Sequence, residues 1–467
     1  MIFTEPKFLL FFAAVFGLYW LLPSARARKA FLLVASYAFY CAWDWRFLSL
    51  ILASTAMDWT AGRMMTRAPA PISRRFWLVA SLVLNLGLLG VFKYLGFFVE
   101  SAAVFLDWLG LSASVPVLEI VLPVGISFYT FQTLSYSIDV YRGNLDASDD
   151  PIDFALFVAF FPQLVAGPIV RAVEFLPQLA TKKRLADVPV RACVGLFLVG
   201  YFKKACVSDN ISPFADRVLS DPAAFDTASN WLSLSIFHVQ LYCDFSGYSD
   251  MAIASAGLLG FTLPRNFDFP YFASSVRDFW RRWHMTLSFW LRDYLYVPLG
   301  GNRGGPVRTT FNLVVVLVLC GLWHGAGWNF VVFGVVHAVL LIGVQWWLRL
   351  VPEESWLRRG VHLGGPLITT LVLMLSWTVF RAESFEKNGE MLRVLFGGGA
   401  GGGQVIPSAL WFLLAAAVVV HAVAWRVGSA PFLRLPRLAF AALLGVGWAL
   451  ALALAAVEYK PFIYFQF

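Results

Sequence analysis

Two histidines are the residues in this sequence best suited to chemistry, and the stronger candidate is His324. It lies in Cys320-Gly-Leu-Trp-His-Gly-Ala-Gly-Trp-Asn329, between two long apolar runs. An imidazole that titrates near neutral pH can take the proton from a hydroxyl group, and glycines beside it can free backbone N–H groups that stabilise an oxyanion. We therefore expect His324 to be a general base. The alternative is a structural histidine held between helices, with Trp323 and Trp328 in a membrane-interface belt.

His284 is the second candidate. It ends the stretch Arg277-Asp-Phe-Trp-Arg-Arg-Trp-His284, where Asp278 and Arg281 are close to it in sequence. Such a mixture of charges and aromatic rings is also typical of a helix that lies in a membrane interface. Both a catalytic and a structural role therefore remain open for His284.

Two carboxylates interrupt the apolar run over residues 231–263. They are Asp244 and Asp250, in Leu241-Tyr-Cys-Asp-Phe-Ser-Gly-Tyr-Ser-Asp250. A buried carboxylate needs a charged or hydrogen-bonding partner. We expect His284 or the arginines near it to supply that partner.

A glycine-flanked loop around Arg303 is a weaker candidate for binding phosphate. In Gly300-Gly-Asn-Arg-Gly-Gly305, exposed backbone amides and a guanidinium could hold an anion, although an ordinary connecting loop has the same composition. The five cysteines form no C-x-x-C pair, so no metal site is predicted. Neither a G-x-S-x-G serine motif nor a G-x-x-x-x-G-K-[ST] nucleotide loop occurs.

The elements that must position these residues are membrane helices. Hydrophobic residues make up 59% of the 467, and charged residues only 14%. A span needs roughly 20 apolar residues, and the chain offers runs for about 11 such helices. The prediction is an all-α, polytopic integral membrane protein with additional re-entrant and interfacial helices. The formal charge of +8 orients the chain in the bilayer and does not indicate nucleic acid.

The first part of the chain has a readable topology. Residues 8–22 form a first span, and the basic cluster at 24–29 behind it predicts a cytoplasmic loop. The run over 30–62 is interrupted at Trp43-Asp-Trp-Arg46, which predicts two short helices joined at the outer surface. Spans are then expected over 76–99 and 118–138.

The region around the histidines is less regular. Two prolines and a glutamine interrupt the apolar run over 152–170, which predicts a re-entrant or interfacial segment, and the basic loop 171–191 is expected to be cytoplasmic. Amphipathic interfacial helices are expected over 271–308. A short helix over 309–323 rises only about 22 Å, which predicts that His324 lies between the bilayer midplane and the outer surface.

Five ordered stretches resemble the membrane-bound O-acyltransferase superfamily, specifically its bacterial alginate O-acetylation branch. The resemblance covers nearly the whole chain and implies one domain over 1–467 around a central tunnel, with N-terminal helices (8–150), a catalytic core (151–350) and C-terminal helices (351–467). The stretches are Leu122–Gln132, Phe161–Ile169, Asp244–Asp250, Arg277–Arg303 and Trp323–Gly325.

The resemblance implies that His324 is the essential catalytic histidine of the superfamily and that His284 matches its second polar position, which holds histidine or asparagine. Candidate substrate-binding residues come from the same stretches: Trp323, Asp244, Ser246, Arg281 and Arg303. The implied reaction moves an acyl group, expected to be acetyl, from a cytoplasmic thioester to a hydroxyl of an exported polysaccharide such as alginate. No bound cofactor or metal is expected.

The implied partners lie on both sides of a bacterial inner membrane. The donor is acetyl-CoA or an acylated carrier protein on the cytoplasmic side. A periplasmic partner of the SGNH-hydrolase type and the polysaccharide lie on the outer side. The alternative function is a proton-coupled transporter that uses buried histidines and aspartates as a relay, but no inverted repeat is evident between the two halves of the chain.

Overall fold

The computed structural model is helical, as the all-α prediction requires. It describes residues 1–67, 70–111, 120–352, 354–397, 401–428, 430–457 and 460–463. Within these ranges there is no β-strand, and one isolated bridge joins Phe225 to Gln404. In an apolar surrounding a helix pairs its backbone polar groups within one segment, which is why continuous apolar runs fold this way.

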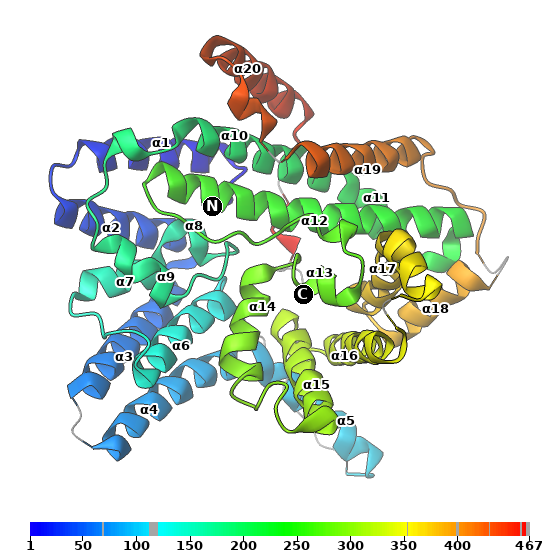
Figure 1. Cartoon of the computed structure of the whole chain (residues 1–467), viewed down its shortest axis with the longest axis horizontal. Coiled ribbons are helices and arrows are strands. Elements are labelled where there is room, and N and C mark those ends of the chain that lie inside the picture. Colours follow the sequence, from blue (N-terminus) through cyan, green and yellow to red (C-terminus); the bar gives the residue numbers. More distant parts are fainter. Residues whose placement is uncertain are drawn as a thin grey trace. The chain divides into compact units, whose positions relative to one another are not determined.

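Two compact units can be distinguished, and each is described by itself. Unit 1 contains residues 1–189 and 255–264, and unit 2 contains residues 190–254 and 265–467. The prediction of one domain over 1–467 stays a prediction. The helices up to residue 189 are α1 (Pro6–Leu21), α2 (Ala25–Asp44), α3 (Leu48–Arg67), α4 (Pro71–Leu89), α5 (Leu95–Trp108), α6 (Ile126–Arg142), α7 (Pro151–Ala159), α8 (Phe161–Leu164) and α9 (Ala172–Leu179) (Figure 1).

Unit 2 holds the remaining helices, except for the last turn of α12, which belongs to unit 1. Short π-helical segments follow α10 and α14. The helices are α10 (Val190–Tyr201), α11 (Asp209–Ser220), α12 (Thr227–Leu258), α13 (Val276–Trp280), α14 (Met285–Leu291), α15 (Gly305–His324), α16 (Trp328–Leu350), α17 (Trp356–Arg381), α18 (Phe385–Phe396), α19 (Ala409–Val427) and α20 (Arg437–Leu454).

Six helical stretches among the described residues are long and apolar enough to cross a membrane. They are Pro71–Trp108, Gly305–His324, Trp328–Leu350, Gly364–Arg381, Ala409–Val427 and Arg437–Leu454. The predicted span over 76–99 is part of the first, in which α4 and α5 continue through a π-helical turn. The predicted first span is present as α1, which is apolar but has only 16 residues. The multi-pass membrane prediction is confirmed, whereas the count of about 11 spans is not.

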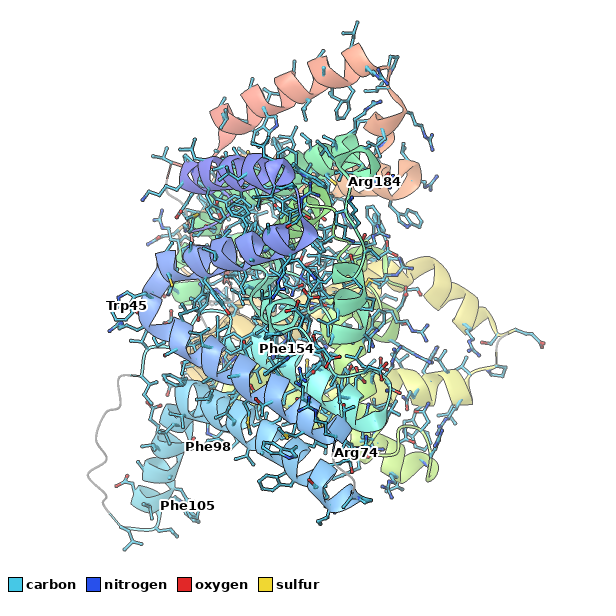
Figure 2. The ribbon with its side chains drawn as sticks, turned by 90° about the vertical axis from the view of Figure 1, so that its left-hand side faces the viewer. Trp45, Arg74, Phe98, Phe105, Phe154 and Arg184 are labelled. Atoms are coloured by element: carbon cyan, nitrogen blue, oxygen red, sulfur yellow. The ribbon has the colours of Figure 1, made fainter. Side chains whose placement is uncertain are left out.

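The predicted break of the run over 30–62 into two helices is confirmed, whereas their junction at the outer surface stays a prediction. Helix α2 ends at Asp44, a single 3₁₀ turn follows, and α3 begins at Leu48. The Asp44 carboxylate accepts a hydrogen bond from the backbone N–H of Arg46 at 3.0 Å, which caps the turn. Trp45 projects from this bend (Figure 2) and is exposed, as expected for an indole at a membrane surface.

Two helix boundaries depart from a simple hydropathy reading. The helix expected over 118–138 begins only at Ile126, because Pro123 and the left-handed Gly125 (φ 76°) precede it. The first two residues of that expected span, 118 and 119, lie outside the described residues. The segment over 152–170 is broken as predicted, since α7 ends at Ala159 and only the four-residue α8 follows before the chain leaves helical geometry.

A buried polar cluster joins α3, α4 and α6 within unit 1. The Asp58 carboxylate accepts hydrogen bonds from the Ser81 hydroxyl, from Asn85 Nδ2 at 2.8 Å and from the Ser137 hydroxyl at 2.9 Å. All four side chains are buried. A buried polar group without partners is costly, so these bonds specify how the three helices face one another.

Helices α15 and α16 form a tight hairpin in unit 2. A Cβ atom on Gly321 would collide with the backbone oxygen of Phe330, and one on Gly334 with that of Leu317, so only glycine permits this approach. Helix α15 also begins earlier than predicted, at Gly305, with Pro306 in its first turn. Its 20 residues rise about 30 Å, the thickness of a hydrocarbon core. The predicted depth of His324 therefore shifts toward the far end of the span.

We predict that Gly321→Ala and Gly334→Ala destabilise the protein by about 1–3 kcal/mol each, because an added methyl group must push the α15 and α16 backbones apart. The matched control is Gly343→Ala, also in α16, where an added Cβ has no atom within 4 Å. Thermal unfolding of the purified protein in detergent measures the effect. Equal melting temperatures for all three variants would contradict this packing.

Candidate active site

His324 is the last residue of α15, as the glycine-broken turn predicted. Its side chain is buried and lies among the rings of Trp323, Phe333 and Phe380, at centroid distances of 5.0, 6.2 and 5.5 Å. Its Nε2 is 4.0 Å from the sulfur of Cys320, one helical turn earlier. The imidazole therefore occupies an apolar, aromatic setting at a helix end, which excludes bulk water from it.

His284 is the residue immediately before α14, and its backbone is in the left-handed region (φ 42°, ψ 54°). This conformation is uncommon for a residue with a Cβ atom, although histidine adopts it more readily than most, and contacts with neighbouring residues stabilise it here. Asn266 supplies the hold: its backbone oxygen accepts from Met285 N–H at 2.9 Å, and its side-chain oxygen accepts from Thr286 Oγ1 at 2.9 Å. The Asn266 amide group in turn donates to Ser249 Oγ at 3.2 Å.

The same Asn266 side-chain oxygen fixes the tautomer of His284. It also lies 3.4 Å from the backbone N of Thr286, which can only donate, so the contacting atom is an acceptor. His284 Nδ1, 3.1 Å from that oxygen, must then carry the proton and donate it. Burial lowers the pKa of His284 to about 3, which keeps the ring neutral. Its Nε2 therefore presents a lone pair, and it has no hydrogen-bond partner among the described residues.

The indole of Trp323 joins the two histidines. Its centroid is 5.0 Å from that of His324 and 5.6 Å from that of His284. On its other side, His284 packs edge-on against Phe245 at 4.7 Å. The structure thus brings His284, Trp323 and His324 together, as a site that uses both imidazoles would require.

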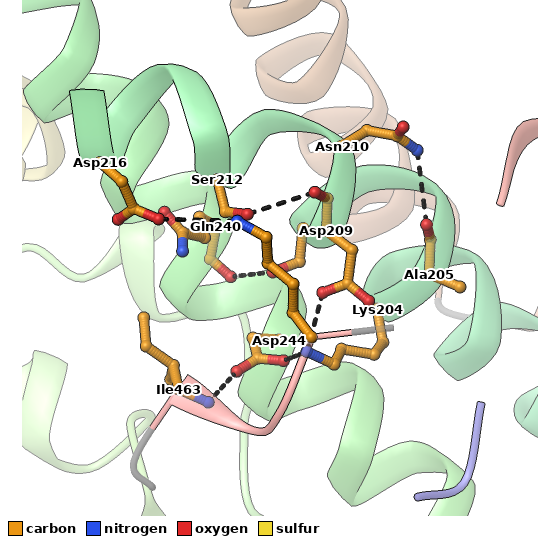
Figure 3. Close-up of polar contacts among 11 residues, drawn as sticks. Lys204, Ala205, Asp209, Asn210, Ser212, Asp216, Gln240, Asp244 and Ile463 are labelled. Atoms are coloured by element: carbon orange, nitrogen blue, oxygen red, sulfur yellow. Dashed lines mark hydrogen bonds and ion pairs between the residues drawn. The ribbon is translucent and has the colours of Figure 1, made fainter. Parts of the chain in front are cut away.

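Asp244 has a different partner from the one we predicted. Lys204 Nζ is 2.5 Å from Asp244 Oδ1 and 2.8 Å from Asp209 Oδ1, and all three side chains are buried (Figure 3). Asp250 pairs with the preceding lysine, Lys203, at 2.7 Å. The expected pairing with His284 or an arginine was therefore wrong, because two lysines from the segment after α10 reach these carboxylates.

In the cluster of Lys204, Asp209 and Asp244, one positive charge faces two carboxylates. Burial acts to lower the pKa of Lys204, but Asp244 and Asp209 outweigh it and the pKa is raised. Burial raises the pKa of Asp209 to about 6 despite its contact with Lys204. Lys204 is therefore held as a cation, and its removal would leave two carboxylates in an apolar interior.

The remaining predicted site residues divide into buried and exposed ones. Ser246 is buried on α12, one turn after Tyr242. Arg281 and Arg303 are exposed, the latter in the loop before α15. A charged guanidinium is costly to bury without a partner, and these two exposed arginines do not join the buried histidines. Among the described residues, no three His, Cys, Asp or Glu side chains converge as metal ligands would.

Sequence reasoning missed three contributors to this region: Lys204, Asn266 and the C-terminal segment. The backbone N–H of Ile463 donates to Asp244 Oδ2 at 2.7 Å, and the buried Phe462 ring packs on Phe245 at 5.1 Å (Figure 3). The adjacent Lys203 and Lys204 in an apolar run were a usable signal, since they match two aspartates in number. Nothing local to Phe462 or Asn266 indicated their contacts, which bridge distant segments.

Comparisons with known proteins identify relatives of this chain. The model of the membrane-bound O-acyltransferase family matches residues 144–381. A probable alginate O-acetylase of Azotobacter vinelandii is 41% identical over 85% of this chain and 79% of its own length. One from Pseudomonas putida is 35% identical over the full length of both chains. A peptidoglycan O-acetyltransferase of Helicobacter pylori is 34% identical over 85% of this chain and 80% of its own.

We predict that Lys204→Met lowers the free energy of unfolding by about 3–5 kcal/mol, since it leaves two buried carboxylates unpaired. The control is Lys387→Met, which removes a lysine 3.2 Å from Glu390 where both side chains are more than a third exposed. That variant should cost less than about 1 kcal/mol. Detergent-solubilised protein is melted in parallel, and similar melting temperatures for the two variants would show that the buried cluster adds no stability.

Proposed function

Because the chain belongs to the membrane-bound O-acyltransferase family, we propose that its two buried histidines form the centre at which an acyl group passes from a thioester to a hydroxyl. The chain is an O-acyltransferase, and its relatives are named for O-acetylation of alginate and of peptidoglycan. The observation that carries the proposal is the packing of His284 and His324 against one indole, Trp323. Membership of this family favours acyl transfer over proton-coupled transport as the role of the buried histidines.

In the proposed reaction His324 is the general base. It removes the proton of the acceptor hydroxyl as that oxygen attacks the thioester carbonyl, which forms a tetrahedral oxyanion. The carbon–sulfur bond then breaks, the thiolate leaves, and the proton on His324 passes to the sulfur. The products are an O-acyl ester and a free thiol, and the enzyme returns to its starting protonation state.

The proposed role of His284 is to orient the acceptor hydroxyl. Of the two roles that the family resemblance allows, orienting and oxyanion binding, the tautomer favours the first. A neutral ring whose Nδ1–H is bound by Asn266 offers a lone pair at Nε2 and no second donor. Such a lone pair can accept from a neighbouring hydroxyl of the acceptor, because the single proton of the reacting hydroxyl goes to His324, whereas an oxyanion would need a donor. Trp323 and Ser246 are proposed to line the substrate path.

The proposed donor is an acetyl thioester, either acetyl-CoA or an acylated carrier protein, that approaches from the cytoplasm. The exposed Arg281 and Arg303 are proposed to meet its phosphates, because a guanidinium can bind phosphate oxygens bidentately. Asp244 is proposed to have a structural role, because it binds Lys204 and the backbone N–H of Ile463 beside the site.

The proposed acceptor is an exported polysaccharide such as alginate, since alginate is the polymer in the names of the relatives at 41% and 35% identity. An SGNH-type partner in the periplasm is proposed to complete the transfer across a bacterial inner membrane. Because the third relative is named for peptidoglycan, an assay should compare other cell-envelope polymers with alginate as acceptors.

We predict that His324→Ala lowers O-acetylation of the exported polymer by at least about 100-fold, the typical contribution of a general base. Mass spectrometry of polymer from cells with equal protein levels measures this. The control is His337→Gln, which alters a buried histidine that is bonded to Trp280 and Ser376 instead of facing the site. If His324→Ala retains full acetylation, the catalytic assignment fails.

We also predict that Asn266→Ala lowers acetylation by about tenfold or more by releasing His284 from its productive orientation and tautomer. Because the effect acts through His284, Asn266→Ala should cause little further loss in a His284→Ala background. The four proteins of this cycle are compared at equal expression. Independent, additive losses would mean that Asn266 serves the fold alone.

A further inference from the structure

A basic pocket lies in unit 1, whereas the two candidate histidines belong to unit 2. Three segments form it: residues 19–29 at the junction of α1 and α2, residues 178–183 at the end of α9, and Phe261 after α12. Its cations are Arg28, Lys29, Lys182 and Lys183, and no aspartate or glutamate lines it. The first two segments are the loops that the positive-inside rule predicts to be cytoplasmic.

Arg28 holds the pocket together. Its guanidinium donates to the backbone oxygens of Leu22 at 2.8 Å and of Lys183 at 3.0 Å, so it ties the first segment to the second. It also lies over the rings of Tyr19 and Trp20, at 5.4 and 5.1 Å. These contacts fix the wall of the pocket and use up most of the Arg28 donors.

Lys182 and Lys183, in contrast, are available to bind an anion. Lys29 is paired with Asp153 at 2.6 Å, but within the described part of the chain Lys182 and Lys183 form no ion pair. The Lys183 ammonium rests 5.1 Å from the centre of the Phe261 ring. Burial lowers the pKa of Lys183, which agrees with a half-buried cation that lacks a counterion.

The start of α2 adds to the positive field. Ala25, the first residue of this helix, lines the pocket, and the first turn of α2 contains no acidic residue. Helix N-termini carry partial positive charge and free N–H groups, both of which favour an anion. The lysines and the start of α2 are therefore two independent sources of positive potential at the same pocket.

We propose that this pocket binds the phosphate group of a ligand presented at the membrane surface. A phosphate offers oxygens in a tetrahedral arrangement, so it can contact the start of α2 and the lysines of the second segment together, which the two coplanar oxygens of a carboxylate do less well. The phosphate belongs to an anionic phospholipid headgroup or to the phosphate-bearing arm of a thioester donor. The lipid source is independent of the proposed reaction, whereas the donor source rests on the proposed function.

The test uses the full-length protein in nanodiscs and two probes. The first is phosphatidylglycerol, compared with phosphatidylcholine and detected by native mass spectrometry; the second is coenzyme A, measured by titration calorimetry. The pocket variant is Lys182→Gln/Lys183→Gln. The control, Arg434→Gln/Arg437→Gln, removes the same number of charges from exposed positions before and at the start of α20.

We expect the pocket variant to bind one probe at least fivefold more weakly than both the wild type and the control. Weaker retention of phosphatidylglycerol alone identifies a lipid site, and weaker coenzyme A binding alone identifies a donor site. Equal binding of both probes by all three proteins overturns the proposal. If the double variant is poorly folded, the single variant Lys182→Gln, at an exposed position, is held to the same criterion with a smaller expected loss.

Discussion

Polar groups in so apolar a chain must find their partners inside the protein, and this constraint shapes both units. In unit 1, Asp58 gathers hydroxyl and amide groups from three helices. In unit 2, Lys204 does the same for two carboxylates. Replacing Asp58 or Lys204 by an apolar residue would require its partners to change too. A buried charge without a partner costs far more free energy than a buried pair.

The constraint also explains how a reactive group is held in place. His284 is kept neutral by burial and is aimed by one amide oxygen, that of Asn266. The aromatic rings around it supply shape and exclude water, but they cannot choose a tautomer. One hydrogen bond therefore determines which nitrogen of His284 carries the proton and which presents a lone pair.

What could be predicted from the sequence follows the same physics. Apolar runs and their interruptions are local signals, so the helical class, the bend at Trp45 and the end of α15 at His324 were predictable. The two histidines could be selected because ionisable groups are rare in such surroundings. Partners such as Lys204 for Asp244, or Ile463 for the same carboxylate, are separated from it by many residues, and no local period encodes them. The early start of α15 at Gly305 was missed because the polar residues before Thr309 do not read as part of a span.

The left-handed backbone at residue 284 has a consequence for which side chains can stand there. Apart from glycine, only a few residue types adopt this conformation with ease, and asparagine, aspartate and histidine lead them. The family resemblance implies histidine or asparagine at this position. Both types can accept a hydrogen bond with a side-chain atom and both tolerate φ of 42°. Two constraints thus limit the residue types that fit at position 284. One is the need for a side-chain hydrogen-bond acceptor, and the other is the left-handed backbone that leads into α14.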